Sequence, residues 1–114
     1  MNKEKITYDE FLEIEKKLEI RIGQIVDVER IPKSKKLLKL TVIFGPNKED
    51  EKTVVTNLGE KFEPEDIVGI WCPFIMNLVP SKMMGVESEA MIMVGERPEG
   101  QIELEDYSMG TKLL

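Results

Sequence analysis

The sequence predicts an all-β fold: a five-stranded barrel preceded by one short helix and followed by a C-terminal extension. Apolar and polar residues alternate along residues 18–28 and 38–44, and this period of two is typical of half-buried strands. Three shorter apolar runs, at residues 52–56, 70–75 and 90–94, complete a set of five strands. One helical connection separates the third strand from the fourth. This order of elements is typical of a closed Greek-key barrel.

The N-terminal helix is expected to run from about Ile6 to Lys17. Thr7 can accept a hydrogen bond at the helix start, and Glu10, three residues later, can complete a capping box. Apolar side chains such as Phe11 are then available for docking. We expect the helix to cover the barrel core; the alternative is that it plugs one end of the barrel or joins a dimer contact.

The first strand carries apolar residues in steps of two from Leu18 to Val28, interrupted at Gln24. Gly23 lies in the middle of this strand, where a bend or a bulge is the usual reason for glycine. A long bent strand that contributes to two sheets is what a small closed barrel requires. We therefore expect this strand to bend at Gly23.

The later elements follow from the same patterns. Residues 45–51 are polar and predict a hairpin tip, whose acidic run at residues 49–51 is expected to be solvated rather than to bind a cation. Residues 58–68 predict the helical connection. Trp71 and Cys72 lie in an apolar run, so burial is expected for both; the alternative for Trp71 is stacking on a base. Residues 77–89 predict a loop, in which Pro80 stops strand pairing and Gly85 supplies a positive φ.

Length and composition predict one soluble domain over residues 1–114, divided into a helix (1–17), a barrel (18–95) and a dimerisation extension (96–114). Hydrophobic residues make up 41% and charged residues 33% of the chain, which indicates a globular protein. No apolar run approaches the roughly 20 residues of a membrane helix, and residues 1–18 are too charged for a signal peptide. A cytoplasmic protein without a membrane partner is the expectation.

The sequence offers few groups for catalysis. It contains one cysteine and no histidine, which excludes an internal disulfide, a thiolate metal cluster and every nucleophile that depends on histidine. No glycine-rich phosphate loop is present, and the carboxylates are scattered. We expect no catalytic activity, no metal and no cofactor.

Positive charge is concentrated in one segment, although the net charge is −6. Residues 20–44 carry six basic and two acidic residues, whereas residues 45–69 carry three basic and seven acidic ones. Three strands, a helical connection and two further strands are the order of an OB-fold. This fold binds nucleic acid between the loop that joins strands 1 and 2 and the loop that joins strands 4 and 5. Those loops contain Lys33, Lys35, Lys36 and Lys82, so the local patch predicts phosphate contacts.

Residues 77–91 read NLVPSKMMGVESEAM and resemble the signature of the tRNA-binding OB-fold family, N-L-x-P-x-K followed by a hydrophobic residue, x-G, and S-[QE]-[GA]-M. The helix start ITYDEF and the strand IRIGQIV are similar to the same family. Its members include the C-terminal domain of many methionyl-tRNA synthetases, a domain of phenylalanyl-tRNA synthetase, and free-standing homodimers. The resemblance extends over nearly the whole chain, from about Ile6 to Leu114.

The resemblance implies a non-catalytic tRNA-binding protein that acts as a homodimer or as a trans-acting partner, a β subunit, of an aminoacyl-tRNA synthetase of the methionyl type. The family's RNA-contacting positions match Asn77, Lys82, Ser88 and Met91. Asn77 and Ser88 can bond a base edge or a 2′-hydroxyl, although each could instead cap its end of the loop. The alternative function, also found in the family, is a chaperone-like dimer that binds unfolded polypeptides.

The chain departs from the family pattern at several positions. Ile31 and Lys35 replace a histidine and an aspartate, Ser81 and Met84 stand where many members have basic residues, and Glu89 replaces glutamine. Fewer positive charges imply weaker RNA binding and a shallower dependence on salt.

The C-terminal extension is predicted to hold a dimer together. Residues 101–104 alternate polar and apolar like an added strand, and exposed apolar side chains would form a patch that monomers rarely keep. The alternative is that this segment folds back over its own barrel. The expected interface residues are Ile102, Leu104, Tyr107, Met109, Leu113 and Leu114.

Overall fold

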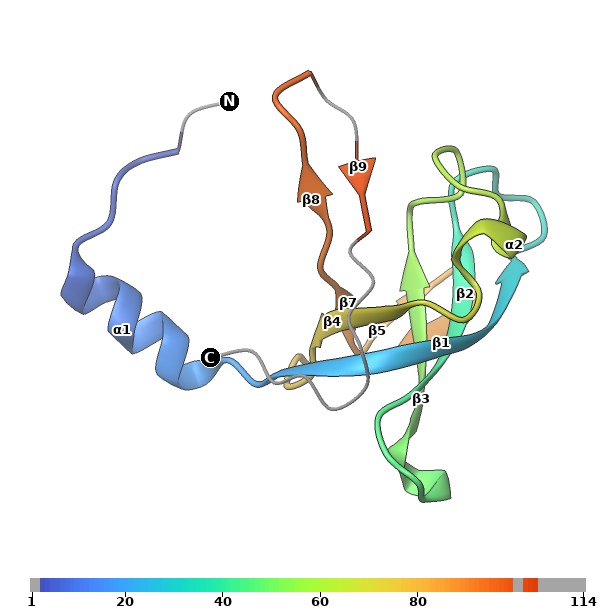
Figure 1. Ribbon diagram of the computed structural model, residues 1–114, viewed down its shortest axis with the longest axis horizontal. Coiled ribbons are helices and arrows are strands. Elements are labelled where there is room, and N and C mark those ends of the chain that lie inside the picture. Colours follow the sequence, from blue (N-terminus) through green and yellow to red (C-terminus); the bar gives the residue numbers. More distant parts are fainter. Residues whose placement is uncertain (1–2, 100–101, 105–114) are drawn as a thin grey trace.

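The computed structural model describes residues 3–99 and 102–104 and confirms the all-β fold with an OB-like barrel (Figure 1). Five antiparallel strands form one curled sheet in the order β3-β2-β1-β4-β7. Their bounds are β1 (Ile20–Arg30), β2 (Leu38–Ile43), β3 (Glu51–Thr56), β4 (Trp71–Ile75) and β7 (Met91–Ile92). The short helix α2 (Pro64–Ile67) connects β3 to β4, as expected, and a 3-10 turn, η1 (Lys48–Asp50), forms the hairpin tip between β2 and β3.

Strand β1 pairs with two neighbours along its length. Its first half, from Ile20 to Gln24, pairs with β4, and its second half pairs with β2. The register shifts between Ile25 and Asp27, so the bulge lies at Val26 and not at Gly23. The bulge also changes which residues face inward, because Ile25 is fully buried whereas Val26 is exposed. The predicted inward position of Val26 was therefore wrong.

Gly23 has a packing role instead of a bending role. A Cβ at this position would lie 2.5 Å from the Phe44 ring and 2.7 Å from Val42. The Phe44 ring in turn meets Phe74 edge to face, with 5.3 Å between centroids. The absence of a side chain at residue 23 lets the Phe44 ring, and with it the aromatic pair, lie against β1.

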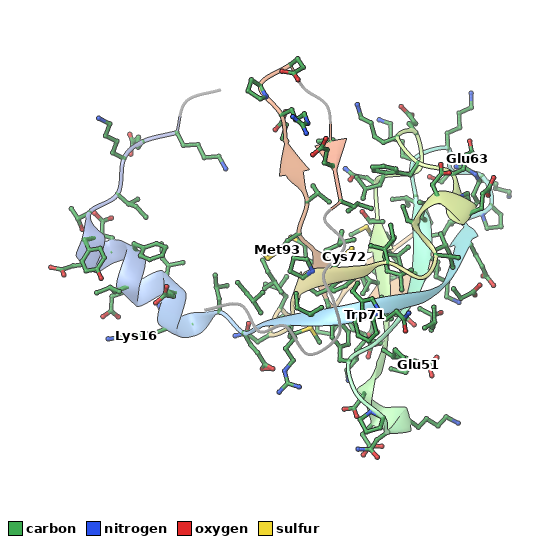
Figure 2. All side chains as sticks on the ribbon, viewed as in Figure 1. Lys16, Glu51, Glu63, Trp71, Cys72 and Met93 are labelled. Carbon is green, nitrogen blue, oxygen red and sulfur yellow. The ribbon has the colours of Figure 1, made fainter. Side chains whose placement is uncertain are left out.

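The core lies inside the curled sheet. Alternate residues of β2 are buried, as the period of two predicts, and Ile67 of α2 closes one end. Cys72, the one cysteine of the sequence, is buried, and Trp71 beside it is half-buried (Figure 2). The buried cluster comprises Ile25, Leu38, Leu40, Val42, Val54, Ile67, Cys72, Phe74 and Ala90.

Helix α1 (Tyr8–Lys17) begins with the predicted capping box. Glu10 N donates to Thr7 Oγ1 and Thr7 N donates to Glu10 Oε1, each at 3.1 Å. The helix buries none of its residues and stands away from the sheet, with Phe11 and Ile14 exposed (Figure 1). The expectation that it covers the core is wrong for the described part of the chain.

Residues 77–89 form a hairpin rather than a plain loop. Strands β5 (Ser81–Met83) and β6 (Val86–Ser88) pair around a two-residue turn. Both turn residues have positive φ, 50° at Met84 and 82° at Gly85, which is the twist that two-residue hairpins favour. Gly85 meets the prediction, and the tight turn imposes a positive φ on Met84 as well.

The predicted added strand is present at the C-terminal side and pairs within its own chain. Strand β9 (Ile102–Glu103) lies antiparallel to β8 (Gly95–Glu96), and Arg97 forms an ion pair with Glu103. Leu104, which follows β9, is half-buried against the core. This placement agrees with the alternative in which the extension folds back over its own barrel, as far as Leu104.

Candidate nucleic-acid interface

The basic turn, residues 31–36, presents three lysines from a rigid backbone. Ile31, at the position where the family has a histidine, is only 5% exposed and anchors the turn in the apolar interior. The Ser34 hydroxyl accepts a bond from Leu37 N at 3.1 Å, and Ser34 N donates to Ile31 O at 3.2 Å. Lys33 has a φ of 69°, which turns the chain outward. Lys33, Lys35 and Lys36 are all exposed.

A second segment, residues 58–63, is hydrogen-bonded to the end of this turn and to Arg30 just before it. Gly59 N donates to Lys36 O at 2.7 Å, and Arg30 Nη1 donates to Gly59 O at 3.0 Å. Arg30 also pairs with Glu63 at 2.9 Å, at the end of the sheet where β1 finishes (Figure 2). From the sequence, Arg30 is predicted only as part of the positive charge of residues 20–44. Its positioning role depends on a partner 29 residues away, which no local pattern reveals.

The lysines of the basic turn keep their charge available. Lys33, Lys35 and Lys36 form no ion pair with any residue that the structure describes, and the same is true of Lys39 on β2. Exposed ammonium groups without a carboxylate partner are free to contact phosphates. Glu29 on β1 lies directly opposite Lys39 in the strand register, without an ion pair between them, and lowers the positive potential around Lys39.

Lys82 is exposed on the hairpin formed by β5 and β6, directly opposite Glu87. Its neighbours Ser81 and Met83 line hollows on the barrel side. Because successive residues of a strand point to opposite faces, Lys82 and Glu87 lie on the outer face of the hairpin. The carboxylate of Glu87 therefore reduces the positive potential around Lys82, which the sequence analysis did not anticipate.

Ser88 is buried, and this placement disagrees with its predicted contact to RNA. Its hydroxyl accepts a bond from Val55 N at 2.9 Å and donates to Ala90 O at 3.0 Å. Next to it, Glu89 Oε2 accepts from Thr53 N and Glu89 N donates to Thr53 O, both at 2.8 Å. These bonds satisfy the outer edge of β3. Ser88 and Glu89 thus close the barrel against β3.

Asn77 also makes its described contacts within the chain. Its Oδ1 accepts from Glu19 N at 2.8 Å, and its Nδ2 donates to the carbonyl of Lys17 at the end of α1. The amide therefore joins the end of β4 to the helix terminus. This matches the alternative in which Asn77 caps its end of the loop.

Met91 is 54% exposed and contributes to the surface between β3 and the hairpin. A groove of about 300 Å³ lies there, lined mainly by apolar side chains of β3, β5 and β7. Met83 and Met91 both line it. Of the seven predicted RNA-contact residues, six are exposed and only Ser88 is buried. Asn77 is exposed but hydrogen-bonded within the chain.

The predicted dimer residues are only partly described. Ile102 and Leu104 are half-buried in this chain. The predictions for Tyr107, Met109, Leu113 and Leu114 lie outside the described residues. Within residues 3–99 and 102–104, no three acidic or cysteine side chains gather to hold a metal ion. No helix in that part of the chain is long and apolar enough to cross a membrane.

Comparison with known proteins agrees with this arrangement. Residues 20–111 match the family model described as "Putative tRNA binding domain". Methionine–tRNA ligase of Methanocaldococcus jannaschii is 41% identical over 101 residues, which are 85% of this chain and 15% of the ligase. The chain thus spans about 15% of the length of that relative.

Two solved structures share the fold. A MetRS-related protein from Pyrococcus horikoshii superposes with a TM-score of 0.78 at 32% identity, over 96% of this chain and 94% of its own. The chaperone CsaA of Bacillus anthracis superposes with a TM-score of 0.70 at 23% identity, over the same shares of the two chains, which establishes a common fold only. Because the family model matches well over half of the chain, this protein belongs to the tRNA-binding domain family.

Proposed function

We propose that this protein binds tRNA without catalysing a reaction, through the basic turn of residues 31–36 and the adjoining surface of the barrel. The observation that carries the proposal is a set of exposed lysines, without an ion pair to any described residue, on a turn anchored by Gly59 and Arg30. Because the backbone of this turn is already held in place, its lysines can contact phosphates with a smaller loss of backbone entropy than lysines on an unanchored loop.

The RNA-contacting residues in this proposal are Lys33, Lys35, Lys36, Lys82 and Met91, which are all exposed. Asn77 and Ser88 act indirectly, because their described hydrogen bonds hold the two ends of residues 77–89 in place. The recognised feature of tRNA is then its backbone shape together with an unpaired region, since lysines read phosphates without regard to sequence.

We further propose a cytoplasmic homodimer, or a β subunit that acts in trans beside a methionyl-tRNA synthetase. Its relatives include a methionine–tRNA ligase that is 41% identical, and the ligase carries this domain within a much longer chain. A separate tRNA-binding chain can raise a synthetase's affinity for tRNA by effective concentration once the two are associated. A dimer would do the same with two RNA sites.

The test is an electrophoretic mobility shift with total tRNA at 50 and 200 mM salt. Binding should weaken steeply between these two salt concentrations, because lysine–phosphate contacts release counterions. Each such contact contributes about 0.7 to 0.9 to the steepness of log K against log salt. Replacing Lys33, Lys35 and Lys36 together by alanine should flatten the slope by about 2 to 3. Lys48→Ala, on the exposed η1 tip, is the matched control. Binding that ignores salt would contradict the proposal.

The second candidate is a chaperone-like module for unfolded polypeptides. It is favoured by exposed apolar side chains on and beside the hairpin, including Val79, Met84 and Met91. Methionines can adapt to varied apolar ligands. The test is whether the protein suppresses the aggregation of a denatured model protein. Suppression that does not depend on salt and is not inhibited by added RNA would favour this function over tRNA binding.

A further inference from the structure

The groove beside β3 has a defined composition. Apolar side chains form most of it, and Asn57 provides the one side-chain amide. The residues that line it are Val55, Thr56, Asn57, Leu58, Met83, Met91, Ile92 and Val94. A hollow of about 60 Å³ adjoins it and shares Val55, Met83 and Met91. Together they make a largely apolar surface, to which Asn57 contributes the one amide and Thr56, Ser81 and Ser88 contribute hydroxyls.

The walls of the groove are held in place. Val55 is on β3, and its amide is bonded to the Ser88 hydroxyl at 2.9 Å. Glu89 and Thr53 exchange two backbone-directed bonds one step along the same edge. The hairpin that carries Met83 is thus fixed against β3 at its base, so the groove does not depend on a ligand to form.

Positive charge lies beside the groove. Leu58 lines it, and the next residue, Gly59, is bonded to the carbonyl of Lys36 at 2.7 Å. Lys39 lies directly opposite Val55 across β2 and β3, so it shares the outer face of the sheet with this lining residue. Neither lysine has an ion pair among the described residues. An anionic backbone can therefore run past the groove while an apolar group enters it.

We propose that the groove takes one unpaired nucleobase of a bound RNA. The ring stacks against the thioethers of Met83 and Met91, and the exposed Asn57 amide bonds the edge of the base. The flanking phosphates contact Lys36 and Lys39. This inference rests on the proposed RNA-binding function and adds the part of the RNA that is recognised: paired bases are stacked inside a helix, so only a loop, bulge or end can supply the ring.

The charge around the groove favours a nucleotide over an apolar peptide as the occupant. A peptide that fills an apolar groove has no need of the neighbouring Lys36 and Lys39, whereas an unpaired nucleotide combines an apolar ring with an anionic backbone. Asn57, exposed at the same groove, matches the donors and acceptors of a base edge.

The test measures fluorescence anisotropy of a labelled eight-nucleotide single-stranded RNA with the full chain. Met83→Ala should weaken binding about threefold to tenfold, because one ring contact is lost. The salt slope should stay unchanged, since no charge is removed. Met84→Ala is the matched control, because Met84 lies at the exposed hairpin turn and does not line the groove.

A second ligand distinguishes binding of the base from binding of the phosphate backbone. With an abasic oligonucleotide of the same length, wild type and Met83→Ala should bind equally, because no ring can enter the groove. If Met83→Ala and Met84→Ala bind the base-bearing RNA alike while wild type still binds tRNA in a salt-dependent manner, the groove proposal is wrong and the proposed function stands. If wild type binds no tRNA, both are wrong.

The peptide alternative is settled by the same variants. Reduced, carboxymethylated lactalbumin serves as an unfolded apolar polypeptide. If Met83→Ala loses affinity for this polypeptide and keeps its affinity for RNA, the groove is a polypeptide site and the nucleobase proposal is overturned.

Discussion

Gly59 lies directly against Lys36. The Gly59 amide donates to the Lys36 carbonyl at 2.7 Å, and a Cβ on Gly59 would come within 2.8 Å of that carbonyl oxygen and within 2.8 Å of the carbonyl oxygen of Lys35. The contact joins two backbone segments, so no flexible side chain can move aside. The position of the basic turn therefore depends on a residue with no side chain, 23 positions further along the chain.

Gly59→Ala should lower the free energy of unfolding by about 1 to 3 kcal/mol, the usual cost of forcing an extra methyl group into a tight contact. tRNA binding should weaken as well, because the turn must move. Urea denaturation and a mobility shift measure the two effects. Gly95→Ala is the control, since the nearest atom to a Cβ there is 3.9 Å away. An unchanged stability in Gly59→Ala would contradict the close contact.

Ser88→Ala should cost about 1 to 3 kcal/mol of stability, because the buried Val55 amide loses its only described acceptor. Its partner across the hairpin, Ser81, offers a matched control. Ser81 is exposed, so Ser81→Ala should change stability by less than about 0.5 kcal/mol. Equal effects of the two changes in urea denaturation would show that the barrel does not depend on the Ser88 bond.

Lys82→Glu should reduce tRNA binding and leave the fold intact, with a stability change of about 0.5 kcal/mol. Glu87→Gln should have the opposite effect on binding, because it removes the carboxylate that faces Lys82 across the hairpin. Anisotropy titrations at two salt concentrations, with thermal melting of each variant, separate binding from stability. If Lys82→Glu binds like wild type, the hairpin's outer face is not part of the RNA surface.

The homodimer should depend on residues beyond Leu104. Light scattering should give twice the 13.1 kDa chain mass for the full chain at micromolar concentration, and a single chain mass for a protein that ends at Leu104. That truncation keeps β9 and its pairing with β8, so the barrel is not shortened. A monomeric full-length protein would rule out the dimer. A truncated chain that remains dimeric would shift the interface to another surface, such as the exposed face of α1.

Elements with a strong local signal can be predicted from the amino-acid sequence alone. The capping box of Thr7 and Glu10, the alternation of β2 and the positive φ at Gly85 each depend on residues at most a few positions apart. The family followed from the motif in residues 77–91, and so did the OB-like fold. These features share one cause: short-range hydrogen bonds and the periodicity of side chains are properties of local sequence.

Which signature residues form hydrogen bonds within the chain depends on the tertiary structure. The Ser88 hydroxyl accepts a hydrogen bond from Val55, 33 residues away. Asn77 accepts one from Glu19, 58 residues away, and the Gly59 carbonyl accepts one from Arg30, 29 residues away. A serine or asparagine has the same donors and acceptors whether it meets RNA or its own backbone. Its role depends on whether it is buried and on whether a distant partner lies within hydrogen-bond distance. For Ser88, both conditions are met only when the barrel closes and brings the free edge of β3 against residues 88 and 89.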